Sequence, residues 1–137
     1  MSCTIDASVH VSSLRLTDVH HAKSIEFFAE MAKESLTAYD PLLVLAECAG
    51  AMKRTTGDLT FALAAVESIR KTPNSVLIPM TETRAERAAE IAAIHSIRGA
   101  DAVYVQVAEE TGSTLITWDA EILTRSAPIV TTLTPAD

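Results

Sequence analysis

Four acidic residues occupy places where a carboxylate costs stability unless something neutralises it. Asp6 follows a short β-branched run, Glu47 stands between an alanine and a cysteine, Asp101 opens an apolar stretch, and Asp119 closes another. Like charges gathered in a partly dry cleft cost several kcal/mol per ion, so they must be met by a cation or removed by protonation. A set of oxygen ligands suits Mg²⁺ or Mn²⁺ better than zinc. The four acids therefore predict a divalent-metal site, provided that the fold brings them together.

Two hydroxyl residues accompany these acids. Ser8 comes two residues after Asp6, and Thr117 comes two residues before Asp119. Residues two apart on a strand lie on the same face, so each hydroxyl is expected beside its acid. Either residue can be an ordinary strand residue, or a hydroxyl that orients a metal-binding carboxylate.

Each acid also has a purely structural interpretation. An aspartate at the start of a helix, as Asp101 is, commonly caps the helix or interacts with its dipole. Asp119 can cap a short helix over residues 120–126, and Glu47 can be a partly exposed helix residue. The argument for a metal site depends on the combination of the four acids, since no single one of them requires it.

Several other kinds of site are excluded or disfavoured. The sequence has no G-x-x-x-x-G-K-[ST] loop, no G-x-G-x-x-G after the first strand, and no G-x-S-x-G elbow. The histidines have no metal-ligand spacing. A phosphate-accepting receiver domain, also acidic and Mg²⁺-binding, needs paired acids after the first strand and a lysine after the last. Here Asp6 stands alone, Met80 ends the third predicted strand where an aspartate is needed, and no lysine occurs beyond Lys71.

Composition sets the limits of the whole molecule. The chain has 137 residues, of which 48% are hydrophobic, and this suits one domain over residues 1–137. No apolar run approaches the ~20 residues of a membrane span, and no basic leader precedes an apolar segment, so a cytoplasmic location without a membrane is expected. The two cysteines, Cys3 and Cys48, are too few for a disulfide framework.

The net charge of −7 gives no general attraction for nucleic acid. A phosphate ligand would need a local basic cluster, and the sequence offers three of them: Lys53-Arg54, Arg70-Lys71, and Arg84 with Arg87. Each cluster can equally be helix-end or solvated surface charge.

Predicted strands alternate with one or two predicted helices along the chain. This alternation predicts an α/β fold with a parallel sheet covered on both faces. The continuous apolar run at 74–80 predicts a central strand, and Asp40-Pro41 predicts an N-cap followed by a helix. Ligands of such sheets bind beyond the carboxyl ends of the strands, where Asp6 and Asp119 are expected. The strands are predicted over 2–9, 37–40, 74–80, 114–118 and 128–133, and the main helices over 20–33, 42–56, 83–97 and 100–111.

Three sequence blocks together resemble the PIN-domain ribonucleases of the VapC toxin type. They are "TIDASV", "PLLVLAECAGAMKR" and "IRGADAVYVQVAEETGSTLITWDAEIL", in the order and spacing of that family. The resemblance implies a three-layer α/β/α sandwich around a parallel sheet of about five strands. It also matches the family's metal-binding acids to four residues here and its supporting hydroxyls to two: Asp6, Glu47, Asp101 and Asp119, with Ser8 and Thr117.

The same resemblance implies an activity and partners. Family members hydrolyse RNA phosphodiesters with Mg²⁺ or Mn²⁺, usually as homodimers, and a cognate antitoxin silences the toxins. The alternative is a PIN fold kept as an RNA-binding or assembly module with little or no nuclease activity.

Overall fold

The computed structural model describes residues 1–137 and contains a five-stranded sheet. All neighbouring strands are parallel, in the order β3-β2-β1-β4-β5. The predicted α/β class and parallel sheet are therefore confirmed. The strands are β1 (Ser2–Ile5), β2 (Thr37–Pro41), β3 (Ser75–Ile78), β4 (Thr114–Ile116) and β5 (Thr132–Leu133).

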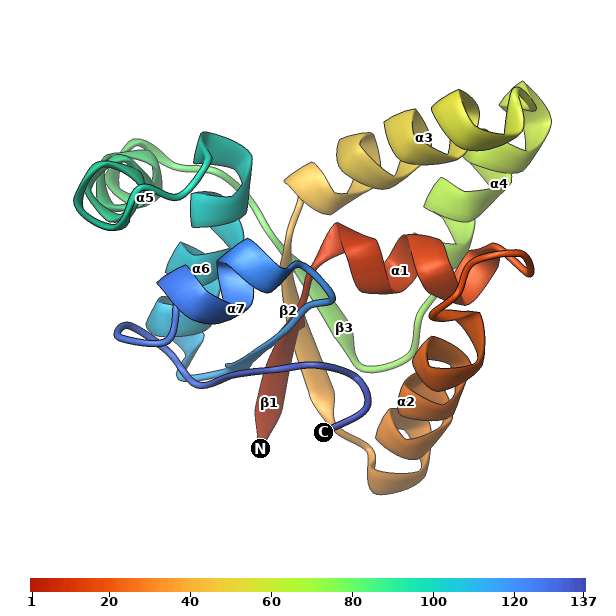
Figure 1. Cartoon of the computed structure of the whole chain (residues 1–137), viewed down its shortest axis with the longest axis horizontal. Helices are drawn as coiled ribbons and strands as arrows, with labels where there is room; N and C mark the ends of the chain where they lie inside the picture. Colours follow the sequence, from red (N-terminus) through yellow and green to blue (C-terminus); the bar gives the residue numbers. More distant parts are fainter.

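Helices pack on both sides of this sheet (Figure 1). In the view shown, α5 and α6 lie on one side and α1 and α2 on the other, while α3 and α4 form an arm above α1. No helix is long and apolar enough to cross a membrane. The helices are α1 (Ala7–Leu14), α2 (His21–Glu34), α3 (Leu43–Thr56), α4 (Leu59–Arg70), α5 (Glu82–His95), α6 (Gly99–Thr111) and α7 (Ala120–Arg125).

Alternation along the central strands produces two hydrophobic cores. Ile5 of β1 and Ile116 of β4 are paired in register and pack with Met31 of α2 on one face of the sheet. The next side chain of β4, Leu115, points to the other face and joins the core that contains Tyr104 of α6. Because successive strand residues face opposite ways, the sheet is buried on both faces and the three layers follow.

The predicted first strand, residues 2–9, is too long. The strand ends at Ile5, Asp6 is the N-cap residue of α1, and the helix includes Ser8. The Asp6 side chain accepts a hydrogen bond from the Ser8 N–H at 3.4 Å, which is the N-cap arrangement. Burial of Val9 against the sheet then stabilises a helix in a segment whose β-branched residues favour a strand.

The interpretation of Asp40-Pro41 as a helix start is also wrong. Both residues end β2, and α3 begins at Leu43 without a side-chain cap. Asp40 is fully buried and accepts hydrogen bonds from the Ile5 N–H at 2.7 Å and from His10 Nε2 at 2.9 Å. This aspartate therefore joins two central elements instead of capping a helix.

The apolar run at 74–80 forms an edge strand and not the central strand predicted. Its strand, β3, pairs only with β2, and Val76 is 44% exposed. A continuous apolar run indicates a strand that is buried on both faces, but it carries no information on which neighbours the strand pairs with.

Candidate functional site

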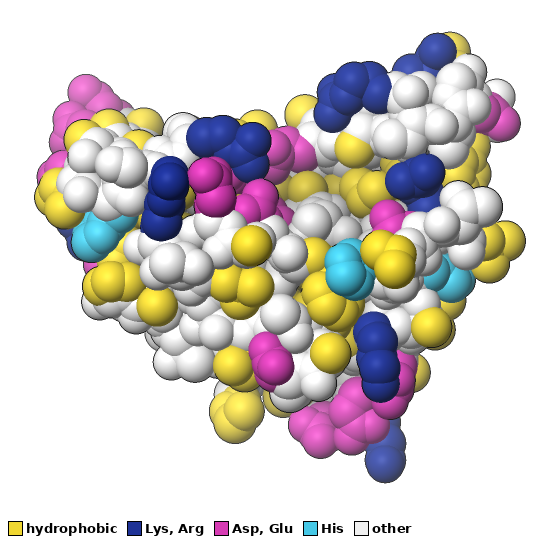
Figure 2. Space-filling view, viewed as in Figure 1, with side chains coloured by type: hydrophobic (Ala, Val, Ile, Leu, Met, Phe, Trp, Pro, Cys, Tyr) yellow, Lys and Arg dark blue, Asp and Glu magenta, His cyan; other side chains and the backbone are white.

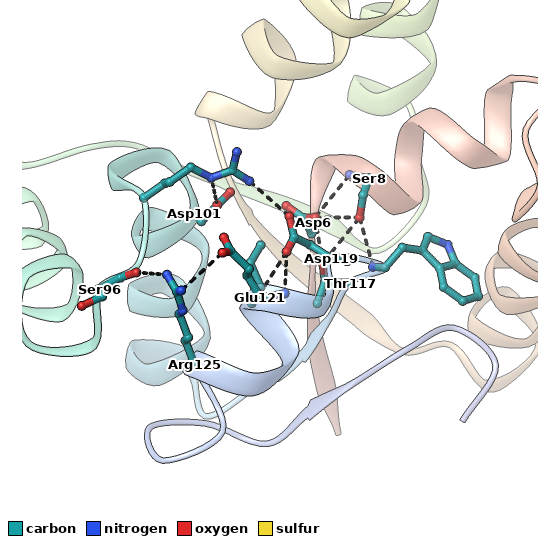
Figure 3. Close-up of polar contacts among 11 residues, drawn as sticks. Asp6, Ser8, Ser96, Asp101, Thr117, Asp119, Glu121 and Arg125 are labelled. Carbon is teal, nitrogen blue, oxygen red and sulfur yellow. Dashed lines mark hydrogen bonds and ion pairs between the residues drawn. The ribbon is translucent and has the colours of Figure 1, made fainter.

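The candidate site lies at the carboxyl ends of β1 and β4, which are neighbours in the middle of the sheet. The Asp6 N–H donates to the Ile116 carbonyl at 2.9 Å, so the ladder between these strands continues one residue past β1. This pairing places Asp6 next to Thr117, and Asp119 follows two residues later in the chain. Figure 3 shows Asp6, Asp101 and Asp119 directed toward one another from three different elements.

Both predicted hydroxyls contact Asp6. Ser8 Oγ donates to Asp6 Oδ2 at 2.6 Å, and Thr117 Oγ1 donates to the same oxygen at 2.9 Å. Ser8 reaches Asp6 from the first turn of α1 and not along a strand face, so that part of the prediction is wrong. Thr117 also accepts a hydrogen bond from the Asp119 N–H at 3.0 Å and therefore links the two aspartates. Asp6 and Thr117 are both buried, which fixes the orientation of the Asp6 carboxylate.

Asp119 has two roles in this geometry. Its Oδ1 accepts hydrogen bonds from the N–H groups of Glu121 and Ile122, at 2.9 and 3.2 Å, and so caps α7. Its Oδ2 forms an ion pair with Arg98 Nη2 at 3.2 Å. The predicted capping role is therefore present, and it leaves the second oxygen directed into the site.

Asp101 does not cap a helix. Residue Arg98 occupies the N-cap position of α6, and the only hydrogen bond of the Asp101 carboxylate comes from Arg98 Nε at 3.0 Å. Burial raises the pKa of Asp101, and the charges of Asp6 and Asp119 raise it further, although Arg98 acts in the opposite direction. Arg98 therefore bridges Asp101 and Asp119, and its positive charge partly offsets the cost of burying the Asp101 carboxylate.

Glu47 reaches the same region from α3. Its Oε1 and the hydroxyl of Tyr104 are both buried, and apart from the interaction between these two side chains neither atom has a hydrogen-bond partner. Burial is the main cause that raises the pKa of Glu47, the charges of Asp6 and Asp101 add to it, and Tyr104 and Arg98 lower it. A buried polar oxygen without a partner is rare in proteins and indicates a position where a ligand can be bound.

These donors fit a hard divalent cation in their chemistry. All are carboxylate oxygens, they are mutually repulsive, and one is unsatisfied, which together favour Mg²⁺ or Mn²⁺. No three His, Cys, Asp or Glu side chains lie close enough to hold one ion in the arrangement described. Arg98 instead contacts the Asp101 and Asp119 oxygens that a cation would bind.

Arg98 was not among the residues predicted for the site. Its position three residues before Asp101 was a usable signal, since an N-cap residue and the third residue of its helix lie close together. The link to Asp119, 21 residues away in sequence, depends on the packing of α6 beside α7 and had no local signal.

Two of the three predicted basic clusters differ in whether their arginines are free to bind a phosphate. Arg84 and Arg87 are paired with Glu110 and Glu109 of α6, whereas Arg54 on α3 forms no ion pair. Figure 2 shows the molecule hollowed between the arm of α3 and the side formed by α5 and α6. Acidic side chains gather on the side formed by α5 and α6, and Lys and Arg side chains lie on both sides of the hollow. The side chains of Arg84 and Arg87 are thus engaged in ion pairs between α5 and α6.

The chain belongs to the PIN domain family, whose pattern matches residues 3–126. This match spans the strand ends and all four acids of the candidate site. No curated protein matches the chain by sequence.

Solved structures share the fold over nearly their whole length. VapC20 of Mycobacterium tuberculosis, a Sarcin-Ricin loop cleaving toxin, has a TM-score of 0.79 at 21% identity, covering 94% of this chain and 97% of that one. VapBC2 of Rickettsia felis, bound to a DNA fragment from their promoter, has a TM-score of 0.75 at 14% identity and 98% coverage of both chains. FitAcB of Neisseria gonorrhoeae has a TM-score of 0.72 at 18% identity and 97% coverage of both. The three-layer PIN fold predicted from sequence is confirmed.

Proposed function

We propose that this PIN-domain protein is a Mg²⁺- or Mn²⁺-dependent ribonuclease, acting as the toxin of a toxin–antitoxin pair. The observation that carries the proposal is the convergence of Asp6, Asp101 and Asp119. The buried Glu47 carboxylate is near enough for the charges of Asp6 and Asp101 to raise its pKa. Membership of the PIN family and the fold shared with VapC-type toxins support it.

The roles of the side chains follow from their contacts. Asp6, Glu47, Asp101 and Asp119 would hold the metal, which when bound supplies a water of lowered pKa and neutralises the phosphoryl oxygens. Ser8 and Thr117 hold the Asp6 carboxylate in one orientation. Arg98 balances the charge of Asp101 and Asp119, and it must yield part of its contacts when a cation binds.

The test is the substitution Asp101→Asn, which keeps the shape of the side chain and removes its charge. Because Asp101 caps no helix, the variant is expected to fold normally and to lose metal-dependent RNA cleavage on the order of 10²–10³-fold. The measurement is cleavage of a structured RNA with Mg²⁺ or Mn²⁺ and with EDTA, together with a melting curve.

Asp58→Asn is the matched control. Asp58 caps α4 by accepting the Phe61 N–H at 3.0 Å, and asparagine caps a helix about equally well. This variant should cleave RNA like the wild type. Cleavage by Asp101→Asn within threefold of the wild type would exclude Asp101 from the metal site.

One observation favours the alternative, a PIN fold that binds RNA or assembles with partners without cutting. Arg98 already neutralises two of the acids, and no group of three ligands is preformed. RNA binding with no cleavage in Mg²⁺ or Mn²⁺ would establish this second function.

The partner we propose is a small antitoxin whose basic segment enters the acidic site. Solved structures with this fold include a toxin–antitoxin complex from Klebsiella pneumoniae and VapBC of Salmonella typhimurium bound to DNA. An arginine from a partner can pair with carboxylates as Arg98 does here. Expression without an inhibitor and without a growth defect would argue against the toxin role while leaving nuclease activity open.

A further inference from the structure

A cavity of about 290 Å³ opens beside Glu47, at the edge of the acidic site, and has no role in the chemistry described above. It lies among α1, α3 and the turn that precedes α2, and Trp118 closes it between the strand end and α7. Ser8 and Glu47 line both this cavity and the acidic site. A group bound here would therefore be adjacent to the reacting phosphate.

An aromatic pair forms one wall of the cavity. The rings of His20 and Trp118 stack with their centroids 3.8 Å apart and their planes 8° from parallel. Both residues are half-buried, and both line the cavity. Stacked aromatic surface at this depth offers a flat π-face to a further ring.

Hydrogen bonds fix the orientation of Trp118. Its backbone N–H donates to Ser8 Oγ at 3.1 Å, and its indole Nε1–H donates to Ser24 Oγ at 2.8 Å. Ser24 is fully buried and is bonded in turn to Ser12 Oγ at 2.6 Å. Because the indole N–H is used inside the protein, Trp118 can recognise a ligand by stacking and not by donating a hydrogen bond.

The charges around the cavity have both signs. Asp18 and Glu47 line it, and Asp18 Oδ1 accepts the backbone N–H of His20 at 2.8 Å, which holds the histidine in place. Arg54 also lines it and forms no ion pair with any acid of the chain. The guanidinium of Arg54 folds over Gly50, where a Cβ atom would lie 3.0 Å from Nη1. Arg54 thus has no acidic partner, and the absence of a side chain at Gly50 allows its guanidinium to lie at the cavity.

We propose that the cavity receives one unpaired nucleotide of the RNA substrate. Its base extends the His20–Trp118 stack, and a neighbouring phosphate pairs with Arg54. The inference rests on the ribonuclease function proposed above and adds to it the place in the fold that holds a nucleotide beside the cut.

Physical chemistry favours an unpaired base over a paired one. A base in a duplex already stacks on its neighbours, whereas an unpaired base can turn out and stack on an aromatic side chain. Stacking is tolerant of sequence because every base has a π-face. The two acids of the lining repel phosphate elsewhere in the cavity, so the phosphate is directed to the Arg54 side.

The chain provides its own probe, because Trp118 is its only tryptophan. The wild-type protein is titrated in metal-free, low-salt buffer with a short single-stranded oligoribonucleotide while tryptophan fluorescence is recorded. The same strand is also tested annealed into a duplex and with one abasic position. We expect the intact single strand to quench the fluorescence, and the duplex and the abasic strand to quench it markedly less.

Substitutions separate stacking from charge. His20→Ala should weaken binding of the single strand by about 5- to 150-fold, the loss expected for one stacked base. Trp118→Phe should retain most of the affinity and Trp118→Ala should not, with binding followed by the anisotropy of labelled RNA. Arg54→Ala should weaken binding and flatten its salt dependence. The matched controls His95→Ala and Lys33→Ala lie outside the cavity and should leave the affinity unchanged.

The outcomes keep the two proposals distinct. RNA that is cleaved in Mn²⁺ but fails to quench Trp118, with His20→Ala cleaving as well as the wild type, overturns the nucleotide site and leaves the nuclease intact. RNA binding that depends on His20 and Trp118, without any cleavage, retains the nucleotide site and overturns the nuclease. Equal loss in Arg54→Ala and Lys33→Ala, equal binding of duplex and single strand, or no binding of RNA overturns the nucleotide site.

Discussion

Arg98 contacts two of the four acids that would hold a divalent cation. Its guanidinium contacts Asp101 and Asp119 at 3.0 and 3.2 Å, although its side chain is 69% exposed. The hydrogen bond to Asp101 raises the pKa of Arg98, and the charges of Asp101 and Asp119 raise it further. Arg98 and a divalent cation would therefore compete for the same carboxylate oxygens.

We expect Arg98→Gln to lower the melting temperature of the metal-free protein and to increase its affinity for Mn²⁺. The first effect follows from leaving like charges uncompensated, and the second from removing the competing cation. The measurement is the melting temperature as a function of Mn²⁺ concentration. Arg125→Gln, which removes a cation bound to the Ser96 carbonyl and to Glu121, is the control. Equal Mn²⁺ midpoints in the wild type and Arg98→Gln would contradict this competition.

The raised pKa of Glu47 predicts a dependence of stability on pH. The folded metal-free protein binds the Glu47 proton more tightly than the unfolded chain does, so its contribution to stability falls as pH rises from about 4.5 through the raised folded pKa. Glu47→Gln should therefore melt higher than the wild type at mildly alkaline pH in EDTA. The two should converge below pH 4.5, where both side chains are neutral. The measurement is a series of melting curves across this range.

Glu26→Gln on α2 serves as the control, since Glu26 is 71% exposed. A Glu47→Gln variant that melts below the wild type at alkaline pH would show that the burial of this carboxylate is compensated in the metal-free protein.

At the scale of elements, two arginines of α5 form ion pairs with α6, the helix that carries Asp101. Arg87 binds Glu109 through two hydrogen bonds, from Nε at 2.8 Å and from Nη2 at 2.6 Å, and Arg84 binds Glu110 at 2.8 Å. The hydrogen bonds to Arg87 and Arg84 lower the pKa values of Glu109 and Glu110 respectively. Because the Arg87–Glu109 pair is bidentate, it contributes more to stability than a surface ion pair with a single contact would.

Glu109→Gln should lower the melting temperature slightly at neutral pH, and salt should reduce the difference. A lowered folded pKa contributes stability above the unfolded value near 4.5, and this stability is lost as pH falls through the folded pKa. The difference between variant and wild type should therefore disappear in acid, as measured by melting curves. Glu90→Gln removes the other partner of Arg87, a single contact at 3.1 Å, and should cost less. A larger loss in Glu90→Gln would show that the pair between the two helices is not the stabilising one.

At the scale of the whole molecule, the arrangement of exposed apolar side chains bears on assembly. The buried stripe of α4 consists of Ala62, Ala65 and Ile69, and leaves Leu59 and Leu63 60% and 56% exposed. The dimer predicted from sequence stays a prediction, and this helix face is apolar surface that a second copy can cover. Light scattering at micromolar concentration should give about twice the monomer mass of 14.7 kDa, and the monomer mass itself would exclude the dimer.

The sequence by itself determined the class of fold and the elements that carry Glu47, Asp101 and Asp119. Alternating strand and helix patterns predicted the parallel sheet, and Gly57 and Gly112 end α3 and α6 in the left-handed conformation, as expected for helix-terminating glycines. The aspartate after "TLITW" was predicted at the start of a short helix, and it is. These features depend on local periodicity and capping, which a single sequence contains.

Only the tertiary structure decided which groups lie together and what each does there. Asp40 is a buried partner of His10 because β2 lies beside β1, and the same residues could have been a helix cap in another topology. Arg98 reaches Asp119, and His20 reaches Trp118, across sequence separations that carry no periodic signal. Local sequence determines the conformational preferences of residues that are close together along the chain. Contacts such as these depend instead on strand order and helix packing, which are settled by burial of the whole core.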